Sequence, residues 1–150
     1  MLTEKDYCDK DLSLALKEAG YIGQGRCYYD LDKEPNKLRH FGIQVLTIRS
    51  AEALNFVLAV HLYDAQKWLR EEKRICVEVD CCAGGYVWEL CKAYHKDWFS
   101  GGTTIYTHYC EDNAINTLLN DCGKYDSYEE ALSEGIKEAV KMLKENDNKD

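Results

Sequence analysis

The apolar positions in the middle of the chain change their period once, and this change predicts a helix followed directly by a strand. Between residues 62 and 69, apolar or small side chains recur at intervals of three and four, the spacing of one buried helix face. These residues are Leu62, Ala65, Trp68 and Leu69. After Arg74 the period becomes two, as in a strand, and one side carries Ile75, Val77 and Val79. We expect Trp68 to be buried against this strand.

The first half of the chain predicts a helix, a hairpin and a break. Thr3 and Asp6 are spaced as an N-terminal cap, and Gly20 supplies a left-handed stop, so a first helix is expected between them. Residues 26–31 and 41–48 are predicted to be paired strands. Residues 51–73 contain no Pro or Gly, which allows one long helix, but the apolar run at 56–60 favours a break, with the central helix starting near His61.

The second half predicts a three-stranded meander and a final helix. A strand at residues 74–80 leads into a glycine turn, a second strand follows from Tyr86, and residues 103–110 are predicted to be the third strand. A capping box precedes the final helix, whose apolar residues keep helical spacing: Ser127 and Glu130, then Tyr128, Ala131, Leu132, Ile136, Ala139, Val140 and Leu143. Gly135 inside this helix costs roughly 1 kcal/mol relative to Ala, so we expect a close approach to another backbone there.

These elements predict the α+β class. We expect a single domain over residues 1–145 with a frayed tail at residues 146–150. Its mainly antiparallel sheet should have about five strands, with the central and C-terminal helices packed on one face. A chain of 150 residues is long enough to bury a core without disulfides or metals.

Charge and hydropathy exclude several classes of partner. The formal net charge of −8 argues against nucleic acid, because affinity for phosphate comes mainly from Lys and Arg. A protein with a basic surface, or a second copy of the chain, is the expected partner. No apolar run approaches the roughly 18 residues of a membrane span, and the N-terminus has no hydrophobic signal core. We therefore expect no membrane partner and a cytoplasmic location.

The eight cysteines do not form a recognisable metal motif. No C-x-x-C pair is present, so we expect reduced thiols, mostly buried as small hydrophobic side chains, and no metal or cofactor. One arrangement offers chemistry: Cys91 and His95 on one strand would face His108 and Cys110 on the next, as zinc ligands or as a nucleophile and its base. Because the sequence does not fix the strand register, unrelated histidines and half-buried thiols are the favoured interpretation.

Aromatic residues are dense in the loop at residues 95–102 and in the strand that follows it. Such a short loop cannot easily hide both Trp98 and Phe99, and Tyr and Trp are enriched at protein interfaces. The alternative is that half of these rings line the core. We expect the partner-binding residues to be Trp98, Phe99, Tyr106 and Tyr109.

Four segments carry a family resemblance: DKDLSLALKEAGY, LYDAQKWLREEKRICVEV, GYVWELCK and YDSYEEALSEGIKEAVKMLK. The motifs L-Y-x-A-Q-x-W-L-R and Y-x-[ST]-Y-E-E-A-L-x-x-G-[IL] resemble a group of short, uncharacterised proteins encoded by phages and prophages of gut anaerobes. The chain departs from that group at Ala59, Val60 and His61, where relatives usually have a proline and a hydroxyl residue. The resemblance implies an accessory gene of a mobile element and no particular activity.

No phosphate loop, dinucleotide fingerprint, zinc-protease motif or serine elbow is present, so we predict a non-enzymatic binding protein of mobile-element origin. Its target would be a host or defence protein that it inhibits. Two alternatives stay open. One is a binding protein for a small, nucleotide-like ligand, and the other is a zinc or thiol enzyme at Cys91, His95, His108 and Cys110.

Overall fold

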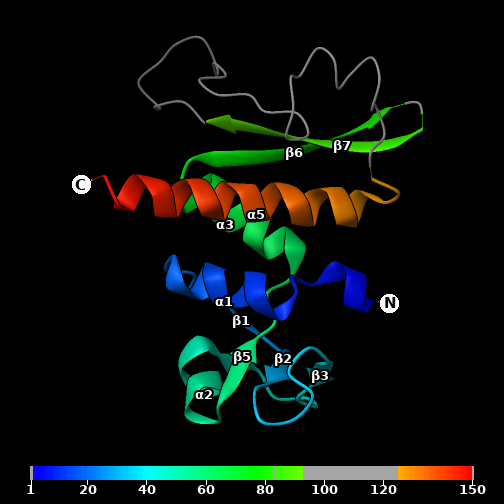
Figure 1. The fold of residues 1–150 in the computed structure, drawn as a ribbon. Helices are drawn as coiled ribbons and strands as arrows, with labels where there is room; N and C mark the ends of the chain where they lie inside the picture. The colour runs from blue at the N-terminus through cyan, green and yellow to red at the C-terminus, as the bar shows by residue number, and fades with distance from the viewer. Residues whose placement is uncertain (1, 83, 93–124, 150) are drawn as a thin grey trace. The chain divides into compact units, whose positions relative to one another are not determined.

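The computed structural model describes residues 2–82, 84–92 and 125–149 (Figure 1). Its helices are η1 (Glu4–Asp6, a 3-10 helix), α1 (Lys10–Glu18), α2 (Ile48–Ala53), α3 (Leu62–Glu72) and α5 (Tyr128–Asp147). Its strands are β1 (Gln24–Gly25), β2 (Cys27–Asp30), β3 (Leu38–His40), β4 (Leu46–Thr47), β5 (Phe56–Leu58), β6 (Ile75–Cys82) and β7 (Gly85–Lys92). The chain divides into two compact units, residues 1–65 with 146–150, and residues 66–145. The single domain over residues 1–145 stays a prediction.

The α+β class is confirmed, but the described residues do not form one sheet of about five strands. They form three small antiparallel sheets, ordered β1–β4, β3–β2–β5 and β6–β7. In the N-terminal unit, positive φ angles at Gly42 (70°) and Asn55 (58°) interrupt the extended backbone, so no strand there is longer than the four residues of β2. The third strand predicted at residues 103–110 lies outside the described residues.

The predicted first helix is two elements. The capping box of Thr3 and Asp6 starts only η1, and α1 begins after Asp9, whose side chain accepts a hydrogen bond from Leu12 N at 2.8 Å. Between them the backbone is extended, because Cys8 N donates to Val60 O at 2.8 Å. Gly20, with φ at 100°, follows the end of α1 as predicted.

The predicted hairpin exists, but its second strand is displaced. β2 pairs with residues 38–40 of β3, where we had predicted residues 41–48. Gly42 turns the chain after Phe41, and the end of the predicted strand instead forms β4 and the start of α2. Thr47 caps α2 by accepting a hydrogen bond from Ser50 N at 3.1 Å, so Thr47 is the cap and Ser50 its partner.

The break before the central helix is confirmed. The left-handed Asn55 ends the α2 segment, β5 follows at residues 56–58, and α3 begins at Leu62. Trp68, however, is only partly buried, and the Lys73 ammonium lies 5.3 Å from the centre of its ring. Successive helical residues point about 100° apart, so Trp68 lies beside the buried stripe that Leu69 occupies rather than within it.

In the C-terminal unit, α5 packs closely on the β6–β7 hairpin at Gly135, but the atoms nearest to this glycine belong to side chains and not, as predicted, to another backbone. A Cβ atom at Gly135 would lie 2.6 Å from Val77 Cγ1 and 3.2 Å from Trp88 Cβ, so only glycine fits this contact. Val79 pairs with Trp88 across the hairpin, which places Val77, Val79 and Trp88 on one face. Gln66 of α3 donates from Nε2 to Val77 O at 2.7 Å and ties the helix to β6.

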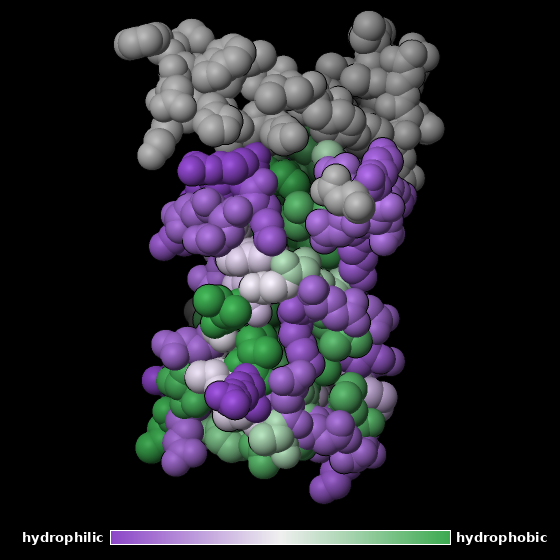
Figure 2. Space-filling view, turned by 90° about the vertical axis from the view of Figure 1, so that its left-hand side faces the viewer, coloured by the Kyte–Doolittle hydropathy of each residue, from purple (hydrophilic) through white to green (hydrophobic). Residues whose placement is uncertain are grey.

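Large apolar side chains reach the surface in the N-terminal unit. Figure 2 shows them in green in the lower part of the view, at the height of α2 and β5 in Figure 1. The most exposed are Ile22 and Ile43, at 87% and 89% of their full surface. Within the described part of the chain, no helix has the length and apolar composition needed to cross a membrane.

The two described tryptophans of the C-terminal unit should differ in their contribution to stability. Trp88 is 2% exposed and donates from Nε1 to the Tyr125 hydroxyl at 3.1 Å, whereas Trp68 is only partly buried. We expect Trp88→Ala to lower the free energy of unfolding by about 3 to 5 kcal/mol, and Trp68→Ala by less than about 2 kcal/mol. Urea unfolding of both variants measures the difference. Equal losses would contradict the assignment of Trp88 as the core residue.

Candidate functional site

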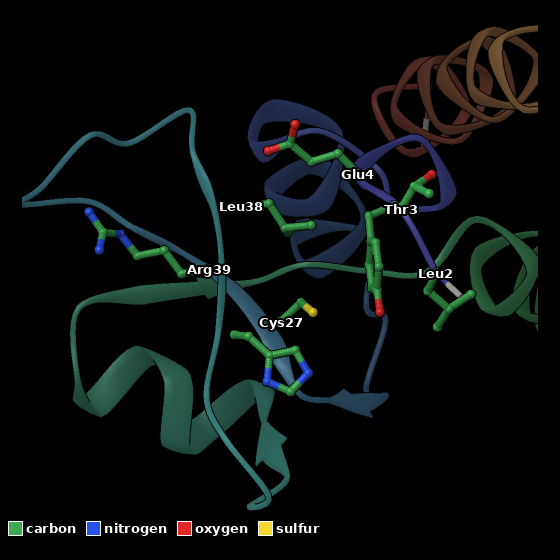
Figure 3. A pocket seen from close by; sticks show the side chains of 8 residues that line it. Leu2, Thr3, Glu4, Cys27, Leu38 and Arg39 are labelled. Carbon is green, nitrogen blue, oxygen red and sulfur yellow. The ribbon is translucent and has the colours of Figure 1, made fainter.

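A pocket of about 410 Å³ opens in the N-terminal unit, between the N-terminal segment and strands β2 and β3 (Figure 3). Its volume lies in the range that small-molecule sites occupy. The residues that line it come from three segments: Leu2, Thr3, Glu4 and Tyr7 from the N-terminal segment, Cys27 from β2, and Leu38, Arg39 and His40 from β3. The pocket therefore combines an apolar wall with a thiol, a phenol, an imidazole and two charged groups.

The register of β2 and β3 brings Cys27 and His40 together. Phe41 N donates to Arg26 O at 2.7 Å, which makes these two residues a hydrogen-bonded pair. Cys27 and His40 form the next pair along the strands, and it is of the non-hydrogen-bonded kind, in which opposite side chains lie closest. Their Cβ atoms are then roughly 5 Å apart on the same face of the sheet.

Tyr7 closes another side of the pocket. It pairs with His61 in an isolated antiparallel bridge, and the two rings meet edge to face with centroids 5.2 Å apart. Burial, followed by a hydrogen bond with the Cys27 side chain, raises the pKa of Tyr7 to about 12. The phenol therefore keeps its proton at neutral pH and can donate it to the Cys27 sulfur.

The charged groups lie at the rim. The Arg39 side chain extends away from Cys27 and Leu38 in Figure 3, as alternation along a strand requires. Its Nη2 donates to Glu34 Oε2 at 2.9 Å, and its buried Nε has no hydrogen-bond partner among the described residues. Glu4 contributes a carboxylate from the N-terminal segment. A ligand in the pocket would thus meet an apolar centre and charges of both signs at its edge.

The residues that the sequence singled out lie elsewhere. The predicted partner-binding residues Trp98, Phe99, Tyr106 and Tyr109 lie outside the described residues. So do His95, His108 and Cys110, and of Cys91 only the backbone is described. Among residues 2–82, 84–92 and 125–149, no group of three or more His, Cys, Asp or Glu side chains is arranged to hold a metal ion.

Sequence reasoning did not single out Tyr7, Cys27 or His40 as a site. Cys27 and Tyr29 lie two residues apart in a strand that the sequence predicted, so their side chains share one face. The period of two could therefore have predicted that Cys27 points inward. His40 was placed before a strand that was expected to begin at Phe41, and Tyr7 was placed inside a helix. Only the observed pairing of β2 with β3 and of Tyr7 with His61 assembles the pocket.

Comparison with protein-family models, with curated proteins and with solved structures found no match for the chain.

Three tyrosines of the N-terminal unit should make it sensitive to alkali. Burial raises the pKa of Tyr7 and of Tyr21 to about 12 and raises that of Tyr29 further, while the Tyr29 hydroxyl donates to Cys8 O at 2.8 Å. In the unfolded chain these phenols ionise near pH 10. The stability they contribute is therefore complete below about pH 10 and is lost as the pH rises toward about 12.

We expect the free energy of unfolding to fall across this interval by up to about 1.4 kcal/mol per pH unit for each of the buried Tyr21 and Tyr29, and by less for the partly exposed Tyr7, whose interactions are screened by solvent. Urea titrations between pH 9 and 12, paired with tyrosinate absorbance, measure it. The variant Tyr7→Phe/Tyr21→Phe/Tyr29→Phe should flatten the dependence, and an unchanged slope would show that these phenols do not cause it.

Proposed function

We propose that the chain is a non-enzymatic binding protein of mobile-element origin, and that its target is a host or defence protein that it inhibits. The observation that carries the proposal is the set of large apolar side chains exposed on the N-terminal unit. In the described part of the chain, this set is Leu2, Ile22, Leu31, Ile43, Val45, Leu54 and Tyr63. Every member lies in residues 1–65.

Ile22 and Ile43 are the members whose exposure most needs an explanation. Each leaves nearly nine-tenths of its side chain in water, and burying one such side chain is worth about 1.5 to 3 kcal/mol. Single exposed apolar residues are common, but several in one small unit supply the apolar contacts of an interface. These residues come from separate loops and helix ends. Such a distribution suits a large protein surface better than a small ligand.

Charge favours a partner with a basic surface. Residues 66–150 carry 17 acidic and 11 basic side chains, whereas residues 1–65 carry ten and eight. Most of the net negative charge thus belongs to the C-terminal part of the chain. Long-range attraction speeds the encounter of such a surface with a basic protein. The same negative charge repels nucleic acid.

The remaining parts of the proposal rest on the sequence. The mobile-element setting follows from the resemblance alone, and a cytoplasmic location fits it. The inhibitory role is proposed from the acidic charge, the aromatic residues of the 95–102 loop and the absence of a catalytic motif from the sequence. Trp98, Phe99, Tyr106 and Tyr109 are proposed as further partner contacts. In the sequence these four residues lie between β7 and Tyr125, and Tyr125 exchanges backbone hydrogen bonds of 2.9 and 3.2 Å with Tyr86 of β7.

A second candidate function is the binding of a small ligand, which the pocket beside Cys27 favours by its volume and mixed lining. The enzyme alternative at Cys91, His95, His108 and Cys110 stays a prediction.

Two double variants test the binding proposal. Ile22→Ser/Ile43→Ser and Trp98→Ser/Phe99→Ser each remove large apolar side chains from proposed contact sites. Because residues that contact a partner lie outside the core of the free chain, we expect near-normal melting temperatures. Each should weaken association by about 2 kcal/mol or more, the scale of an interface hot spot. The immobilised wild-type chain is first used to capture the partner from host lysate. Titration of the purified partner then gives its affinity for each variant. If the partner is a second copy of the chain, analytical sedimentation gives the affinity of self-association.

The matched control is Asp32→Ser/Lys33→Ser, which changes an exposed loop without removing apolar surface and should leave the affinity unchanged. The proposal is wrong if the wild-type chain is monomeric and retains no protein, or if neither double variant binds its partner more weakly. Unfolding of Trp98→Ser/Phe99→Ser would show that those two rings belong to the core.

A further inference from the structure

We propose that the pocket of the N-terminal unit is a site of covalent thiol modification, in which Cys27 exchanges with small disulfide compounds and His40 accepts the thiol proton. This inference is independent of the protein-binding proposal, since it concerns the interior of the pocket and not the exposed isoleucines. It depends on three features of the described residues: a thiol in the pocket wall, an imidazole paired with it across two strands, and a phenol that lines the same pocket.

Cys27 differs from the other described thiols in its surroundings. Cys8 lies in the same unit and is 0% exposed, but it does not line the pocket, whereas Cys27 is 5% exposed and forms part of the pocket wall. In the C-terminal unit, burial and then the charge of Glu78 raise the pKa of Cys76, which makes its thiolate scarcer. Cys81 is exposed on β6.

The neighbours of Cys27 suit a reactive thiol. His40, directly opposite on β3, can take the proton, and the protonated phenol of Tyr7 can donate a hydrogen bond to the sulfur. The other ionisable groups around the thiol are Tyr29 on the same strand and Glu4 and Arg39 at the rim. The residues that line the pocket thus include one carboxylate, that of Glu4, together with the Arg39 guanidinium and the His40 imidazole.

The reaction is a balanced exchange. The Cys27 sulfur attacks one sulfur of R–S–S–R while His40 accepts its proton, a new S–S bond forms to Cys27, and the old S–S bond breaks. The leaving thiolate then takes the proton from His40 and departs as R–SH. The disulfide is the oxidant, and no other reagent is consumed.

The shape and lining of the pocket indicate the class of disulfide. A volume of about 410 Å³ admits a compact compound, and the side chains of Leu2 and Leu38 favour an apolar or aromatic body. A small aromatic disulfide, such as 5,5′-dithiobis(2-nitrobenzoate), is therefore a suitable probe.

The test follows the rate at which each cysteine of the native, full-length protein reacts with this probe. Peptide mapping by mass spectrometry of samples quenched at successive times resolves the sites. We expect Cys27 to react at least about tenfold faster than Cys8, whose rate reports opening of the whole unit. In His40→Gln the rate at Cys27 should fall by about tenfold or more, with the rate at Cys81 unchanged.

Three results would overturn the inference. They are a rate at Cys27 no greater than that at Cys8, a rate at Cys27 that His40→Gln leaves unchanged, and an equal fall at Cys81 in that variant. Circular dichroism of His40→Gln shows whether the substitution alters the fold, and Tyr7→Phe offers a second variant, for which a slower reaction at Cys27 is expected.

Discussion

The close approach of α5 to the β6–β7 hairpin at Gly135 is the constraint on which the C-terminal unit depends. A side chain at this position would overlap Val77 and crowd Trp88, so the helix can lie this close only because residue 135 has no Cβ. The contact brings Ala131, Ile136 and Ala139 into the core, all fully buried. Glycine weakens an isolated helix, and the packing it permits offsets this cost.

Periodicity predicted the long elements and failed where local backbone geometry or side-chain facing decided the result. The final helix, the glycine-turn hairpin and the break before the central helix were correct because each follows from local sequence. The strand opposite β2 was misplaced because Gly42, inside the expected segment 41–48, turns the chain directly after Phe41. Trp68 is less buried than predicted, because a large apolar residue beside a buried stripe satisfies the same spacing as one within it.

The pocket shows why a site is harder to predict than its elements. Cys27 was assigned to the correct strand, yet its neighbours depend on which residues of β3 lie opposite and on a contact with Tyr7, twenty positions away. Strand register and long-range pairing are not encoded by period alone, since a shift of one residue exchanges the two faces. The acidic charge and the aromatic residues, in contrast, are properties of composition and could be identified directly.

The measurement that most directly tests the central contact is a double-mutant cycle of Gly135→Ala and Val77→Ala, followed by urea unfolding. We expect Gly135→Ala alone to destabilise the protein by at least about 1 kcal/mol through overpacking, and to cost clearly less when Val77 is Ala. If α5 did not approach the hairpin here, the higher helix propensity of Ala would instead stabilise the protein by roughly 1 kcal/mol in both backgrounds, which would contradict the account.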